Sequence, residues 1–182
     1  MIRVADADAE IGLVAAPQWL QAAVDWVNMK RFVDAELELW AIAPEYHGVS
    51  GPTGDAPAAV EVCNGKAEGR LYFPTSTELV DEDGVDVPER DAREALIHTL
   101  LHEYGHWVQY VRDGCKAGDW RHFSEYERTD DYCAEPWEVF AEGFADEHVE
   151  ECLAWCNAAA QMIASDPPMM GVLRDWLRSQ RA

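Results

Sequence analysis

The sequence lacks the two features that would direct a chain into or across a membrane. It has no run of about 18 consecutive apolar residues, so we expect no transmembrane helix. Its first residues, MIRVADADAEIG, lack the basic start and apolar core of a signal peptide. We therefore expect a cytoplasmic or virion-associated protein that does not bind membranes.

Lysine is scarce, and the chain as a whole is strongly acidic. Three lysines and eleven arginines stand against 35 acids, which gives a formal net charge of −21. Such a surface repels phosphate groups, so we expect no nucleic-acid partner. The acidity has two interpretations: solubility in a salt-rich cytoplasm, as in a halophilic or viral source, or selection of cationic substrates. Because the acids are spread along the entire chain, the first interpretation is favoured.

Cysteine is also sparse, with five residues, an odd number that does not indicate a disulfide scaffold. Cys152 and Cys156, one helical turn apart, could hold a soft metal, but such thiols are more often small core residues. A hydrophobic content of 48% and eight tryptophans predict a substantial core. With 182 residues the chain is expected to form one domain. Its sheet and first helix would occupy about 1–75, and its motif and C-terminal helices about 88–182.

Periodicity of the apolar residues predicts a mixture of strands and helices. We expect strands at 2–4, 36–42, 60–63 and 70–73, and helices at 17–32, 89–111, 136–165 and 170–178. Stretches rich in Gly, Pro and Asp predict loops at 43–58 and 75–88, and residues 113–134 read as an irregular segment that contains several aromatic residues.

The helix predicted at 89–111 is the centre of the sequence. Pro88 precedes it, where a missing N–H costs nothing, and Gly114 follows it as a left-handed cap. Its apolar residues occupy nearly every face, which is typical of a buried helix. Burial is costly for polar groups without partners, so the polar residues in its middle must be satisfied by something.

Those polar residues form the pattern His102-Glu103-Tyr-Gly-His106. Histidines four residues apart on a helix can hold one Zn²⁺, with the intervening glutamate as a general base that does not bind the metal. The alternative is a core helix that merely carries two histidines. Gly105 weakens the helix relative to alanine, and we interpret it as a place where another backbone comes close.

A third zinc ligand is expected to be an acid on another element, because Arg112 occupies the position where a third histidine would extend the motif. Glu138 and Glu142 lie four residues apart and share a helix face. A zinc ion on Glu138 and a histidine N–H on Glu142 would satisfy both carboxylates; the alternative is that both face solvent. Glu135 precedes a proline and is biased away from helical geometry.

The segments HEYGH and YCAEPWEVFAEGFA together resemble zinc metallopeptidases of the gluzincin type, in particular lethal-factor-like and small bacterial or phage zinc peptidases. The resemblance covers roughly 92–145. It implies that Glu138 is the third metal ligand and that Glu142 orients a ligand histidine. With the predicted elements, it implies an α+β, zincin-like fold in which a small, mostly antiparallel sheet packs on the motif helix and on a second, glutamate-bearing helix.

The resemblance also implies a tyrosine shortly before the ligand glutamate, where its hydroxyl can stabilise an oxyanion. Tyr132 fits this role best, Tyr126 is second and His122 is a further alternative, although each could simply pack in the interior. His98 is expected to be a core histidine with a polar partner, because three ligands on successive turns of one helix would strain a tetrahedral site.

We therefore predict a zinc metalloendopeptidase that acts on a peptide or protein, with Zn²⁺ as cofactor and Glu103 as general base. The strand at 70–73 is expected to pair with an extended substrate. One alternative is a non-catalytic structural or virion-associated protein, whose closed zinc site would gain a fourth ligand such as His98 or Cys133. Another is a regulator that cleaves a single partner.

Overall fold

The computed structural model describes residues 1–43, 58–62, 65–75, 88–115 and 136–165. Its elements are β1 (Ile2–Val4), a short 3-10 helix (Ala9–Ile11), α1 (Gln18–Lys30), β2 (Leu37–Ile42), β3 (Ala59–Val62), β4 (Gly69–Pro74), α2 (Glu89–Arg112) and α3 (Pro136–Ser165). The strands and helices predicted in this part of the chain are confirmed, with small differences at their ends. The helix predicted at 170–178 and most of the predicted loops lie outside the described residues.

The sheet has the strand order β1-β2-β4-β3 and is mixed. β1 pairs with β2 and β2 pairs with β4 in parallel, and only β3 and β4 are antiparallel. The prediction of a mostly antiparallel sheet is therefore wrong. Parallel neighbours need a crossover connection, and α1 supplies it between β1 and β2.

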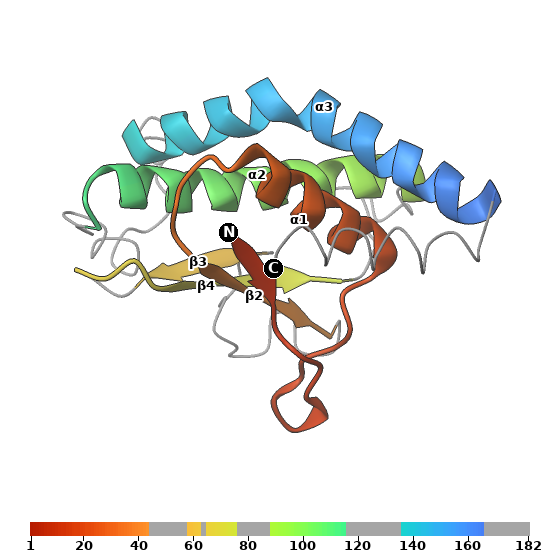
Figure 1. The fold of residues 1–182 in the computed structure, drawn as a ribbon, viewed down its shortest axis with the longest axis horizontal. Coiled ribbons are helices and arrows are strands. Elements are labelled where there is room, and N and C mark those ends of the chain that lie inside the picture. The colour runs from red at the N-terminus through yellow and green to blue at the C-terminus, as the bar shows by residue number, and fades with distance from the viewer. Residues whose placement is uncertain (44–57, 63–64, 76–87, 116–135, 166–182) are drawn as a thin grey trace, which may run out of the picture.

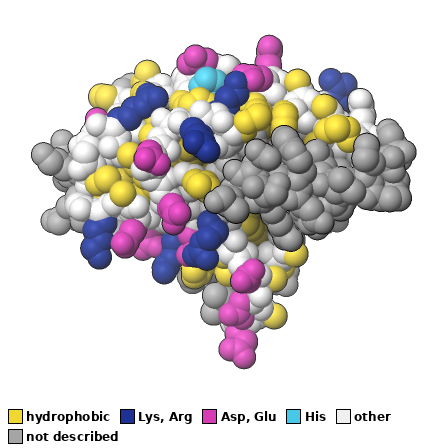
Figure 2. Space-filling view, viewed as in Figure 1, with side chains coloured by type: hydrophobic (Ala, Val, Ile, Leu, Met, Phe, Trp, Pro, Cys, Tyr) yellow, Lys and Arg dark blue, Asp and Glu magenta, His cyan; other side chains and the backbone are white. Residues whose placement is uncertain are grey.

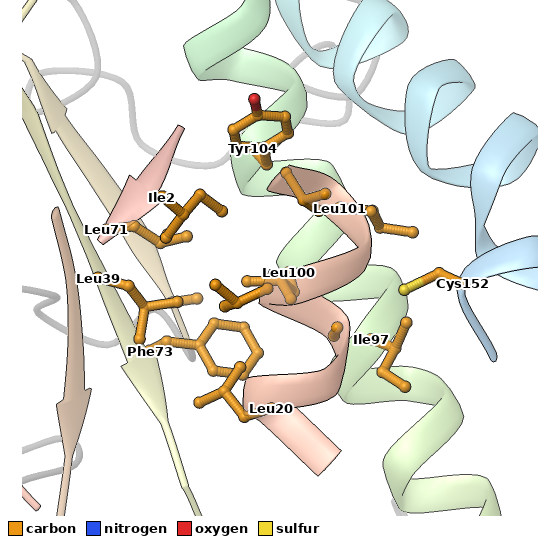
Figure 3. Close-up of a cluster of buried hydrophobic side chains, with 14 of the residues drawn as sticks. Ile2, Leu20, Leu39, Leu71, Phe73, Ile97, Leu100, Leu101, Tyr104 and Cys152 are labelled. Atoms are coloured by element: carbon orange, nitrogen blue, oxygen red, sulfur yellow. The ribbon is translucent and has the colours of Figure 1, made fainter. Parts of the chain in front are cut away.

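The helices lie on one face of this sheet in two layers (Figure 1). α1 and α2 lie nearest the strands, and α3 lies across their far side. The middle position of α2 explains why it is buried on nearly every side, as its sequence predicted. Figure 3 shows Leu39 and Phe73 from the sheet turned toward Leu20 of α1 and Leu100 of α2. Cys152 of α3 joins the same core, as expected for a small apolar side chain.

The opposite face of the sheet carries charged side chains in one row across the strands. The register aligns Arg3 with Glu38, Glu38 with Arg70, and Arg70 with Glu61. Arg3 forms an ion pair with Glu38, and the Arg70 Nε lies 3.8 Å from the other Glu38 oxygen. Acidic side chains elsewhere are spread over the visible face rather than gathered in one patch (Figure 2). Within the described residues, no helix combines the length and apolarity needed to cross a membrane.

α2 and α3 approach each other most closely at Gly105. A Cβ added there would lie 3.0 Å from the Cα of Ala141 and 3.3 Å from its carbonyl oxygen. The prediction that another backbone comes close at Gly105 is confirmed. At the C-terminal end of α2, Gly114 has a φ of 74°, the left-handed conformation predicted for it. The close approach at Gly105 allows short acidic side chains on α3 to reach histidines on α2.

Candidate metal centre

Histidines on α2 face carboxylates on α3 in a single row. The two helices run in opposite directions along it, and each set repeats every four residues, which keeps its members on one face. From the buried end to the exposed end, the row consists of the pairs His106 and Glu138, His102 and Glu142, and His98 and Asp146. Exposure of the carboxylates rises along it, from 7% for the Glu138 side chain to 56% and then 70%.

The buried end brings together His102, His106 and Glu138. The Nε2 atom of His102 lies 3.2 Å from one Glu138 oxygen, and that of His106 lies 3.5 Å from the other. A tetrahedral zinc ion with bonds of about 2.0–2.1 Å holds neighbouring ligand atoms about 3.4 Å apart. The three residues are thus a group of nitrogen and oxygen donors, all within 4.8 Å of one another, and they fit such an ion.

The surroundings of Glu138 explain why this end of the row suits a cation. Glu138 lies in the first turn of α3, where the helix dipole favours a negative charge. Its carboxylate is nonetheless buried, and a buried charge requires a compensating partner. Burial also lowers the pKa of His106 to about 4, so this ring is neutral at pH 7, the state in which imidazole binds metals.

His102 is held from both sides. Its Nδ1 atom lies 3.0 Å from an oxygen of Glu142, which leaves its Nε2 directed at Glu138. Burial alone would lower the pKa of His102, but the hydrogen bond with Glu138 and the negative charges of Glu103 and Glu138 outweigh it and raise the pKa. A carboxylate on the second ring nitrogen is the usual support of a metal-binding histidine. The structure thus places Glu142 beside a histidine of the trio, as the sequence predicted.

Glu103 follows His102 on α2 and is half-buried. Burial raises its pKa to about 7, with an opposing effect from the charge of His102 and a further increase from Glu138. A hydrogen bond from the backbone of Val60 in β3 also favours the ionised form. A carboxyl group that titrates near neutrality is suited to both accept and release a proton.

His98 does not join the buried trio. Its Nε2 atom lies 3.1 Å from Asp146, so it has the polar partner that we expected, although its side chain is 29% exposed rather than in the core. Asp146 is a neighbour of His98 that we did not predict from the sequence. Its position one turn after Glu142 mirrors the spacing of the histidines, and this repeat is the signal that could have revealed it.

Other predicted site residues lie outside the described part of the chain. These are His122, Tyr126, Tyr132 and Cys133; Glu135, which we do not predict to be a ligand, also lies there. Comparison with protein-family models, with curated proteins and with solved structures gives no match. The structure has an α+β fold, and its described residues contain two side-chain groups that could hold a metal ion.

Proposed function

We propose that the protein is a zinc-dependent peptide-bond hydrolase with a zincin-like arrangement, in which His102, His106 and Glu138 hold Zn²⁺. One observation carries the proposal. The buried carboxylate of Glu138 faces the Nε2 atoms of both histidines, while Glu142 contacts the other nitrogen of His102. Three protein ligands are typical of catalytic zinc, which keeps a further position for water or substrate, whereas structural zinc is closed by four.

Bound zinc would lower the pKa of a water molecule toward 7 and polarise the scissile carbonyl. The carboxylate of Glu103 would take the proton from the attacking water and deliver it to the departing nitrogen, which its pKa of about 7 supports. Glu142 would keep His102 in the required tautomer by accepting its Nδ1 proton. Tyr132 remains our proposed oxyanion donor, with Tyr126 and His122 as alternatives.

The prediction that residues 70–73 pair with an extended substrate is wrong, because β4 is hydrogen-bonded to β2 on one side and to β3 on the other. Of those three strands, β3 ends the sheet as the structure describes it. The backbone hydrogen bond from Val60 to Glu103 brings β3 beside the proposed base. We therefore assign substrate pairing by strand addition to β3.

Two substitutions and a matched control test this function. We expect Glu103→Gln to retain zinc but to lose at least about 100-fold in the rate of casein hydrolysis, because the base is removed. Glu138→Ala should weaken zinc retention during dialysis, measured by metal analysis. Glu94→Gln removes the same charge from an exposed position of α2 and should change neither property. Hydrolysis by Glu103→Gln at the parent rate would refute the mechanism, and unchanged zinc in Glu138→Ala would move the third ligand elsewhere, to Glu142 first.

The same assays separate the two alternatives. The structural alternative requires a fourth protein ligand, and His98 faces Asp146 instead of the buried trio. A zinc-loaded wild-type protein that cleaves nothing in a random peptide library would nevertheless favour a structural zinc site. Cleavage of one native protein, without cleavage of casein or of the library, would favour a regulator with a single partner.

A further inference from the structure

The exposed end of the row of histidines and acids forms a second group of metal-ligating side chains. The Nε2 atom of His98 lies 3.1 Å from Asp146 Oδ1 and 3.7 Å from Glu142 Oε1. All three donor atoms lie within 4.8 Å of one another. These separations bracket the spacing of about 3.4 Å that a tetrahedral zinc ion imposes on its ligands.

The exposed end uses the same kinds of donor as the buried end, in a different ratio. The buried group has two imidazoles and one carboxylate, and the exposed group has one imidazole on α2 and two carboxylates placed one turn apart on α3. His98 faces both Glu142 and Asp146 with its Nε2 atom, so the three donors converge on one point. The mixture of imidazole and carboxylate donors distinguishes this group from an ordinary cluster of surface acids.

We propose that His98, Glu142 and Asp146 form a second, weaker binding site for Zn²⁺ or a similar divalent transition-metal ion. The imidazole donor favours zinc over Mg²⁺ and Ca²⁺, which prefer oxygen ligands. Glu142 can serve both sites at once, because Oε2 faces the Nδ1 of His102 and Oε1 faces His98. The exposure of the two carboxylates makes the ion easier to lose than one held at the buried end.

Sharing Glu142 would couple the two sites. A cation on Oε1 withdraws negative charge from the carboxylate and so weakens the hydrogen bond that Oε2 accepts from His102. That hydrogen bond increases the basicity of a metal-binding histidine, so filling the exposed site should loosen zinc at the buried one. The coupling rests on the proposed function, whereas the existence of the exposed site does not.

Calorimetric titration of the metal-free, full-length protein with ZnCl₂ tests the exposed site. We expect two binding events in the wild-type protein. The double variant His98→Ala/Asp146→Asn should keep the tighter event and weaken the other at least about ten-fold, the lower end of the losses seen when ligand support is removed. Glu147→Gln, which makes the same charge change as Asp146→Asn one residue further along α3, should keep both events. Millimolar CaCl₂ should not compete with the weaker event.

Other outcomes separate this proposal from the function of the buried site. Glu138→Ala should lose the tighter event and keep the weaker one; loss of neither event would refute the buried site alone. A single event in the wild-type protein up to millimolar zinc that Glu138→Ala abolishes, or two unchanged events in the double variant, would overturn the exposed site and leave His98 as a simple hydrogen-bond partner of Asp146. Circular dichroism must show a native fold for each variant, and the single variants His98→Gln and Asp146→Asn replace the double variant if it unfolds.

A separate experiment measures the coupling between the two metal sites. Zinc pre-bound at one equivalent is extracted with a chromophoric chelator, with and without a second equivalent. In the wild-type protein the second equivalent should speed release of the first, and in the double variant it should not. Equal release rates in the wild-type protein would refute the coupling through Glu142.

Discussion

The substitution Gly105→Ala sets two physical effects against each other at the contact that carries the candidate site. Glycine in the interior of a helix is about 1 kcal/mol less favourable than alanine, so helix propensity alone predicts that the variant is more stable. The contact with α3 predicts the reverse. The added Cβ would lie 3.0 Å from the Ala141 Cα, closer than an ordinary van der Waals contact.

The steric cost of the contact should exceed the gain in helix propensity, because the atom that obstructs the new methyl group belongs to a backbone. Ala141 cannot rotate away, so α3 must move by a few tenths of an ångström. Overpacking of this kind costs about 1–3 kcal/mol. After the gain in helix propensity, Gly105→Ala should be up to about 2 kcal/mol less stable than the parent. Glu138 lies on the α3 turn that moves, so the zinc affinity should fall as well.

Gly143→Ala is the matched control, because it makes the same change on α3 with nothing within 4 Å of the new Cβ. It should gain up to about 1 kcal/mol and keep its zinc affinity. Urea unfolding of the metal-free proteins gives the stabilities, and competition with a chelator gives the zinc affinities. If Gly105→Ala is stabilised as much as Gly143→Ala and binds zinc equally well, then the close approach does not govern the site.

Two further predictions concern protons. First, zinc binding should release more protons at pH 6 than at pH 8, because the raised pKa of His102 in the metal-free protein means that the ion must displace a proton. Titrations in two buffers of different ionisation enthalpy measure this release, and a heat independent of the buffer at pH 6 would contradict it. Second, burial raises the pKa of Glu103 from its ordinary 4.5 to about 7, so between these values the unfolded chain loses its proton before the folded one does. Glu103 therefore contributes a loss of stability of the metal-free protein as the pH rises through this window, while the lowered pKa of His106 contributes a gain. Glu103→Gln should remove the loss that Glu103 contributes, worth up to about 3 kcal/mol by pH 8. Urea unfolding at pH 5 and pH 8 decides this, since an unchanged dependence on pH would exclude Glu103 as its source.

The sequence located the secondary-structure elements because their apolar periods and their caps are local signals. Pro88 and Gly114 bracket α2, and the alternation in residues 36–42 places Leu37 and Leu39 toward the core. Strand direction is not a local signal. The order of strand, helix and strand from Ile2 to Ile42 did contain the information, since a helix between two neighbouring strands favours a parallel pair.

The buried end of the candidate site was predictable for a similar reason, since the spacing of His102 and His106 already fixes them on one helix face. Asp146 was not predicted, because an exposed acid on a helix is commonplace and only the packing of α3 on α2 gives it a partner. The contact between Val60 and Glu103 could not be predicted from the sequence either, because it is made by the backbone and depends on how β3 lies beside α2.

In our proposal, the row of histidines and acids holds two metal ions that serve different purposes. Both ends combine imidazole and carboxylate donors, with two imidazoles at the buried end and one at the exposed end, so the kinds of donor alone do not separate a tightly held ion from an exchanging one. Burial distinguishes the two ends, because the attraction between unlike charges grows as the effective dielectric constant falls. The buried end, with Glu138, therefore suits a resident ion, and the exposed end, with Asp146, suits an ion that comes and goes with its concentration. Glu142 belongs to both ends, so an ion at the exposed end can change the properties of His102 without touching it.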